Sequence, residues 1–122
     1  MIILGLHLTG IFAGLYESQI RIDFPQHVLA GVLFGLTWLW WLKPENKIDI
    51  SKWLIIISTL GFAALLGSLW EILEFAVWKS LPAFANSFKF YSPTVGELLG
   101  DVIANLIGSL LVGLYAIRKK NK

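Results

Sequence analysis

The chain has 122 residues, enough for a single domain over 1–122, and 57% of them are hydrophobic while only 15% are charged. The mean hydropathy is +0.72. A soluble domain of this length has too little interior for so much apolar side chain, so the composition excludes an ordinary water-soluble globule and favours a membrane protein. The absence of cysteine excludes disulfide frameworks, thiolate metal sites and cysteine nucleophiles.

Four apolar stretches predict an all-α bundle of four transmembrane helices. They cover about residues 2–22, 26–42, 53–78 and 95–117. A spanning helix needs roughly 20 apolar residues, a length that the third and fourth stretches meet. Tryptophans flank the second and third stretches, as expected at membrane–water interfaces.

The helix ends have recognisable capping residues. Ser51 is placed to cap the third helix. Thr94, with Glu97 three residues on, has the pattern of a capping box at the start of the fourth. Between these two helices we expect an irregular loop over 80–92.

The basic residues predict the orientation. Seven of the ten Lys and Arg residues lie in the segment 43–52 or the tail 118–122, which four helices place on one side of the membrane. Because positive charge concentrates in cytoplasmic segments, both termini are expected in the cytoplasm of a multi-pass protein of the cell membrane.

Polar side chains interrupt three of the apolar stretches at similar depth, toward the opposite, outer side. Helical spacing aligns the members of each set on one face. Charged groups facing lipid are costly, so these side chains should face the bundle interior and line one outward-facing pocket, with Glu97 near its rim. The three sets are Asp23 with His27, Glu71 with Glu74, and Glu97 with Asp101 and Asn105.

Several carboxylates in one pocket require compensation. A divalent cation (Mg, Mn, Zn or Fe) is one solution, because carboxylates and an imidazole suit these metals. Protonated acids, or pairing with a basic side chain from the outer side, are the alternatives. The candidate metal ligands are Asp23, His27, Glu71, Asp101 and Asn105, and the candidate catalytic groups are Glu71, Glu74 and Asp101.

At these segments the sequence resembles the VanZ-like family of small bacterial membrane proteins. Asp23 and His27 are similar to an aspartate and histidine that open a helix in that family, and Glu71 with Glu74 resembles its glutamate followed three residues later by a polar residue. The stretch 101–108, Asp-x-x-x-Asn-x-x-Gly, resembles its closing helix. The resemblance implies the bacterial cytoplasmic membrane and a role near the cell envelope. The family is named for a protein linked to resistance against the antibiotic teicoplanin.

Three functions are compatible with this pattern. In the first, the pocket holds a divalent metal and acts on or binds an envelope lipid or lipid-linked precursor. In the second, the chain is a small proton- or cation-coupled transporter. In the third, it is a non-catalytic accessory membrane protein. The expected partners are the lipid bilayer and, for a transporter, a second copy in a homodimer. Nothing in the sequence indicates nucleic-acid binding.

Overall fold

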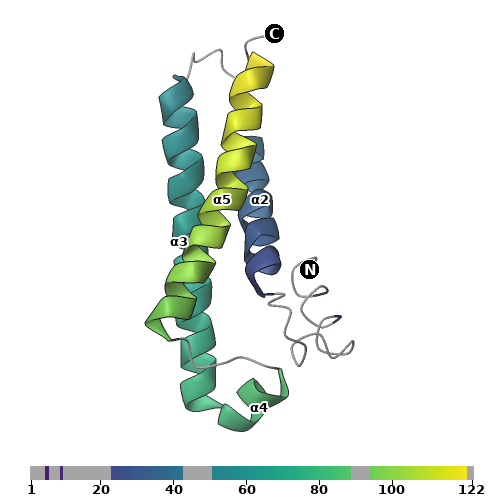
Figure 1. Cartoon of the computed structure of the whole chain (residues 1–122), viewed down its shortest axis with the longest axis vertical. Helices are drawn as coiled ribbons and strands as arrows, with labels where there is room; N and C mark the ends of the chain where they lie inside the picture. The colour runs from purple at the N-terminus through teal and green to yellow at the C-terminus, as the bar shows by residue number, and fades with distance from the viewer. Residues whose placement is uncertain (1–4, 6–8, 10–22, 43–50, 89–93, 121–122) are drawn as a thin grey trace.

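The computed structural model describes Gly5, Thr9 and residues 23–42, 51–88 and 94–120. Every regular element in this part is a helix: α2 (Asp23–Trp41), α3 (Lys52–Ser80), α4 (Pro82–Ser87) and α5 (Val95–Lys120). Figure 1 shows α2, α3 and α5 running side by side along the long axis, with α4 turning away at the far end of α3. Apart from Gly5 and Thr9, which are helical, the helix expected over 2–22 lies outside the described residues.

Both predicted helix caps are confirmed. The Ser51 hydroxyl accepts a hydrogen bond from the backbone N–H of Leu54 at 3.2 Å. The Thr94 hydroxyl accepts from the backbone N–H of Glu97 at 3.2 Å, while the Thr94 backbone N–H donates to the Glu97 carboxylate at 2.9 Å. These bonds satisfy N–H groups that lack an intrahelical partner, and they fix where α3 and α5 begin.

The segment after α3 differs from the irregular loop expected over 80–92, because Pro82–Ser87 form the short helix α4. Proline is well tolerated in a first helical turn, where its missing N–H would have no partner. The rings of Phe84 and Phe88 stack one turn apart, with centroids separated by 4.4 Å. A helix of fewer than two turns is too short to show a hydrophobic period in sequence, which is why the pattern did not reveal it.

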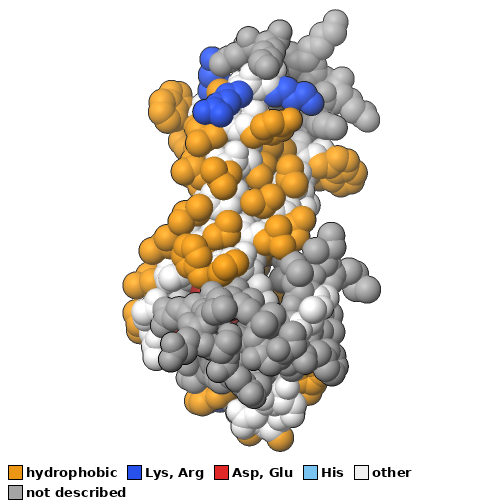
Figure 2. All heavy atoms as spheres, turned by 45° about the vertical axis from the view of Figure 1, so that its right-hand side comes forward, with side chains coloured by type: hydrophobic (Ala, Val, Ile, Leu, Met, Phe, Trp, Pro, Cys, Tyr) orange, Lys and Arg blue, Asp and Glu red, His pale blue; other side chains and the backbone are white. Residues whose placement is uncertain are grey.

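Two of the described helices, α3 and α5, are long and apolar enough to cross a membrane. At 1.5 Å per residue, α3 is about 43 Å long, more than the roughly 30 Å hydrocarbon core of a bilayer. Exposed Trp53 and Trp78 lie near its two ends, where indole rings favour the headgroup region. Figure 2 shows a broad apolar surface between the ends, with Lys and Arg side chains gathered at the end where α3 begins and α5 finishes.

The bundle interior is built from small and polar side chains. In lipid, helices associate through close packing and hydrogen bonds rather than through burial of large apolar groups, so small residues belong at the contacts. The buried residues are Ala30, Gly31 and Gly35 of α2, Thr59, Ala63, Gly67 and Glu71 of α3, and Ala104, Asn105, Gly108, Ser109, Val112 and Gly113 of α5.

The closest helix pair is α2 with α5, whose backbones touch at two glycines. A Cβ atom added to Gly31 would collide with the carbonyl oxygen of Asn105. A Cβ atom added to Gly108 would collide with the carbonyl oxygen of Val28. Backbone atoms cannot move aside as a flexible side chain does, so only glycine fits at either position.

Helix α3 packs on both members of this pair, and an indole links it to α2. The ring of Trp38 in α2 stacks on Phe62 of α3 with centroids 4.9 Å apart, and its N–H donates to the hydroxyl of Ser58 at 3.0 Å. One tryptophan therefore supplies both apolar contact and a polar anchor between α2 and α3.

The two-glycine contact predicts a large difference between matched alanine variants of α5. Gly108→Ala must separate α5 from α2, so we expect a loss of about 1–3 kcal/mol in stability, the usual cost of overpacking. Gly100→Ala in the same helix is the control, since nothing lies within 4 Å of its added Cβ. Thermal unfolding in detergent micelles measures both. Equal unfolding temperatures for the two variants would contradict the close α2–α5 contact.

Candidate functional site

The first two polar residues of the site meet because α2 begins earlier than the expected residue 26. The helix begins at Asp23 and tolerates Pro25 in its first turn. Asp23 and His27 are then one helical turn apart, with the Asp23 carboxylate 3.5 Å from Nε2 of His27. Asp23 keeps a side chain that is 55% exposed, whereas that of His27 is 11% exposed.

The third residue comes from α5. Asp101 lies one turn after Glu97, the last residue of the capping box, and its carboxylate is 3.7 Å from the same Nε2 atom of His27. One ligand atom from each of Asp23, His27 and Asp101 lies within 4.8 Å of the other two. We refer to these three residues as the Asp–His–Asp cluster.

The geometry of this cluster is close to that of a metal site. Histidine nitrogen and carboxylate oxygen bind a cation such as zinc at about 2.0–2.2 Å, so two ligand atoms of a tetrahedral site lie about 3.3–3.6 Å apart. The distances of 3.5 and 3.7 Å from Nε2 of His27 to the two carboxylates are close to this range, so small side-chain rotations would close the cluster around an ion. Three protein ligands also leave coordination positions open for water or for another oxygen donor.

Two further predicted residues lie deeper in the bundle. The Asn105 side chain, 1% exposed, places its Nδ2 atom 3.3 Å from Nδ1 of His27. Glu71 is 2% exposed and interacts electrostatically with Asp101 and His27. Among the described residues, neither Oδ1 of Asn105 nor Oε1 of Glu71 has a hydrogen-bond partner. Two buried acceptor oxygens thus lie beside the cluster without a donor, which is unusual in a protein interior.

The remaining predicted acids have different surroundings. Glu74, half-buried one turn beyond Glu71 in α3, interacts with Glu71 and with the indole of Trp70. Glu97 is exposed, and its carboxylate accepts from both the backbone N–H and the hydroxyl of Thr94, each at 2.9 Å. The expected position of Glu97 near the pocket rim therefore corresponds to a helix cap.

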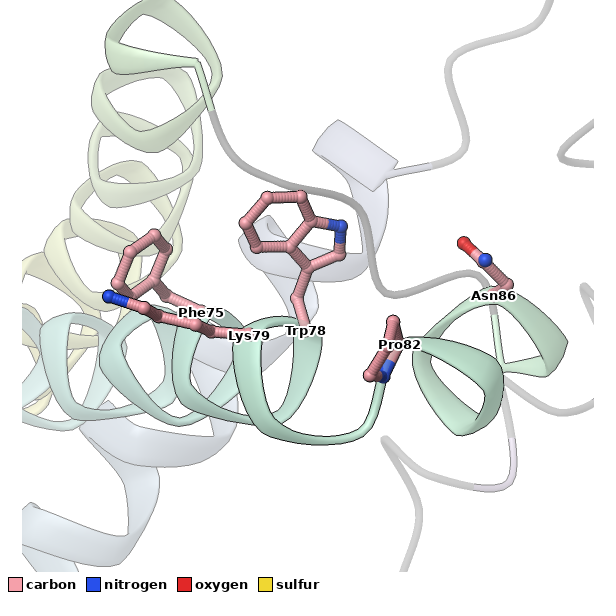
Figure 3. Close-up of a pocket in the computed structure, with 5 residues that line it drawn as sticks. All are labelled: Phe75, Trp78, Lys79, Pro82 and Asn86. Carbon is pink, nitrogen blue, oxygen red and sulfur yellow. The ribbon is translucent and has the colours of Figure 1, made fainter.

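A separate hollow lies where α3 meets α4. Figure 3 shows Phe75, Trp78 and Lys79 at the end of α3, with Pro82 and Asn86 of α4 completing the lining. The rings of Phe75 and Trp78 are tilted against each other, with centroids 6.2 Å apart. This hollow shares no lining residue with the Asp–His–Asp cluster, and its mixture of rings, an amine and an amide suits a membrane–water boundary.

Sequence reasoning missed one residue that shapes the site. Gly67 precedes Glu71 by one turn, and a Cβ atom added to it would lie 2.8 Å from Nδ2 of Asn105. The absence of a side chain there makes room for the Asn105 amide. The signal was present as a stripe of small residues at four-residue spacing, Thr59, Ala63 and Gly67, leading to Glu71.

Comparison with known families agrees with the membrane character of these helices. The family model described as "Predicted membrane protein (DUF2238)" matches residues 1–122. The chain belongs to this family of membrane proteins. Neither a curated protein nor a solved structure matches the chain. The resemblance to the VanZ-like family stays a prediction, and the function has to be argued from the site itself.

The burial of the Glu71 carboxylate is expected to lower the stability of the metal-free protein. A buried polar atom without a partner costs about 1–3 kcal/mol, and more when it is charged. We therefore expect Glu71→Gln to raise the stability of the metal-free protein. Thermal unfolding in micelles with a chelator present measures the change. Glu97→Gln is the control, because glutamine also completes a capping box, and it should leave the unfolding temperature unchanged. A drop in the unfolding temperature of Glu71→Gln alone would contradict this account of its burial.

Proposed function

We propose that the protein binds a divalent cation through Asp23, His27 and Asp101, and that the cation binds the phosphate of an envelope lipid or lipid-linked precursor. The single observation that carries the proposal is the position of three ligand atoms from two helices within 4.8 Å of one another. Charged and ionisable groups inside membrane proteins are costly and usually serve function. A cation between Asp23 and Asp101 would offset the repulsion between their charges.

The mixture of ligands limits which cations the cluster would favour. Imidazole suits zinc and iron, and carboxylates suit magnesium and manganese, so an imidazole with two carboxylates favours Zn, Mn or Fe over Mg. The coordination positions left open are available to a phosphate oxygen. Glu71 and Glu74 are the neighbouring acids proposed to give or take a proton if the bound lipid reacts, and Glu74 is the less buried of the two.

The depth of the cluster supports a lipid headgroup as the ligand. Asp101 is the seventh residue of α5, about 9 Å along the axis from Val95. The whole helix, about 39 Å long, exceeds the roughly 30 Å hydrocarbon core, so its first turns extend into the headgroup region. Phosphates of lipids lie in that region, within about two helical turns of Asp101 along α5.

Packing beyond the cluster supports a one-ended site over a transport pathway. A Cβ atom added to Gly35 would lie 3.1–3.3 Å from side-chain atoms of Val112 and Thr59, so the three helices are in close contact at that level. The buried hydroxyls of Thr59 and Ser109 donate to carbonyl oxygens of their own helices, at 2.6 and 3.1 Å. Polar groups therefore concentrate at one end of the bundle.

The orientation proposed with this site follows the distribution of basic residues. Among the described residues, Lys52 begins α3, and Arg118 and Lys119 lie in the last turn of α5, all at the end opposite the cluster. The positive-inside tendency places that end in the cytoplasm, so the cluster faces the outer leaflet. Because the chain has no cysteine, single cysteines can test this orientation. Ser87→Cys should react with a membrane-impermeant maleimide in intact cells, and Lys52→Cys only after permeabilisation. The reverse result would place the site on the cytoplasmic leaflet.

Metal and lipid binding can be measured together by native mass spectrometry of the protein in detergent. With Zn²⁺ and short-chain phosphatidic acid, the wild type should retain one cation and, only when the cation is present, one lipid. Short-chain diacylglycerol, which lacks the phosphate, should not be retained.

The ligand variants test the assignment of residues. His27→Ala and Asp101→Asn should lose the cation, with an affinity at least 10-fold lower, and lose the lipid with it. Glu97→Gln, an exposed carboxylate outside the cluster, should behave as the wild type. If the lipid still binds after the cation is removed, the cation does not hold the lipid and that part of the proposal is wrong. If the wild type binds no cation, the whole proposal is overturned.

A further inference from the structure

The buried amide of Asn105 lies between the other two helices of the site. Its Nδ2 atom is 3.3 Å from Nδ1 of His27 in α2 and would be 2.8 Å from a Cβ atom on Gly67 in α3. With its side chain 1% exposed, Asn105 has little freedom to turn away from these neighbours. The amide is therefore held against the ring nitrogen that faces away from the carboxylates of the cluster.

The hydrogen positions implied by this arrangement conflict with metal binding. If Nδ2 of Asn105 donates to Nδ1 of His27, the neutral imidazole carries its hydrogen on Nε2. Nε2 is the atom that faces Asp23 and Asp101, at 3.5 and 3.7 Å. An Nε2–H group can donate to these carboxylates, but it has no lone pair for a cation. The same arrangement also leaves Oδ1 of Asn105 buried without a donor among the described residues.

One half-turn of the amide reverses the hydrogen bond between Asn105 and His27 and so resolves the conflict with metal binding. Oxygen and nitrogen of an asparagine amide have nearly the same size, and their positions are interchanged by a rotation that needs almost no extra space. After the rotation, Oδ1 accepts a hydrogen bond from Nδ1–H of His27. The imidazole hydrogen is then on Nδ1, and the lone pair of Nε2 points between the two carboxylates.

We propose that Asn105 is a positioning residue that selects the metal-binding tautomer of His27, its amide turning so that Oδ1 accepts from Nδ1–H when a cation binds Nε2. The inference rests on the proposed function, since it concerns the same cation. In the metal-free protein, the proposal has Nδ2 of Asn105 donating to Nδ1 of His27, with Nε2–H between Asp23 and Asp101. Metal-bound histidines in general donate their second N–H to an oxygen, which fixes both the tautomer and the ring orientation. Asn105 was expected from the sequence to bind the metal directly, and here it acts through His27 instead.

Nitrogen-15 NMR of the histidine rings tests the tautomer directly in the wild type. The chain has two histidines, so His27 is assigned by comparison with a His27→Ala sample, and His7 serves as an internal reference. Without metal, we expect the His27 hydrogen on Nε2. On addition of Zn²⁺, the hydrogen should move to Nδ1 while the Nε2 resonance shifts through coordination. Zinc bound at Nδ1 with the hydrogen still on Nε2 would overturn the inference and leave the metal site intact.

Substitutions of Asn105 provide a second readout in the full-length protein, by zinc titration in micelles. Asn105→Asp retains an acceptor and cannot donate, so it should bind Zn²⁺ as tightly as the wild type or more tightly. Asn105→Leu offers no acceptor and should bind 10–100-fold more weakly, the usual effect of removing an outer partner of a metal-bound histidine. Ser109→Ala is the matched control, because this buried hydroxyl one turn deeper bonds only within its own helix and should leave the affinity unchanged.

The outcomes separate the two proposals. Equal zinc affinity in Asn105→Leu and the wild type would overturn the role of Asn105 while the cluster stands. Weak binding in Asn105→Asp as well as in Asn105→Leu would mean that the amide acts as a donor, and would also overturn it. A wild type that binds no Zn²⁺ overturns both proposals. If Asn105→Leu does not fold, the wild-type spectra and Asn105→Asp still decide the question.

Discussion

The direct backbone contact between α2 and α5 is the constraint on which the rest of the structure depends. Gly31 and Gly108 let each helix reach a carbonyl oxygen of the other, so the two backbones are in direct contact. His27 precedes the first glycine by one turn, and Asp101 precedes the second by two turns. The distance between the imidazole and the carboxylate is therefore set by backbone packing, before any attraction between the side chains acts.

The interior of the bundle shows why polar groups can be kept there. With glycine, alanine and threonine at the contacts, the helices leave space for few side chains, and those that enter are Asn105, Glu71 and His27 from three different helices. His27 and Asn105 contact each other, and glycine at position 67 leaves room for the Asn105 amide. Such a site does not need a large apolar core, because burying apolar side chains between helices gives little stabilisation when the surrounding lipid is equally apolar.

Much of this arrangement could be predicted from the sequence, and the reasons for the remainder are physical. The capping residues Ser51 and Thr94 were predictable because a cap is a local hydrogen bond between residues three apart. The meeting of Asp23, His27 and Asp101 was also expected, since helical spacing puts the polar residues of each helix on one face and the cost of charge in lipid turns these faces toward the bundle interior. The short helix α4 was not, because so few residues show no period. Glu97 was expected both in a capping box and near the pocket rim, and its hydrogen bonds are those of the cap. The role of Gly67 depends on which helix faces Asn105, a fact of tertiary packing that spacing alone does not contain.

The unequal exposure of the two aspartates has a consequence for how long an ion would stay. Asp101 is 14% exposed and fixed within α5, while Asp23 is 55% exposed and belongs to the first turn of α2, where helices fray most readily. An arriving ion would meet Asp23 first and lose its hydration shell in stages. The same carboxylate would release first on departure. A site with one such outer ligand exchanges its ion with the surroundings. In the orientation proposed above, its occupancy would follow the supply of metal outside the cell rather than persist from the time of folding.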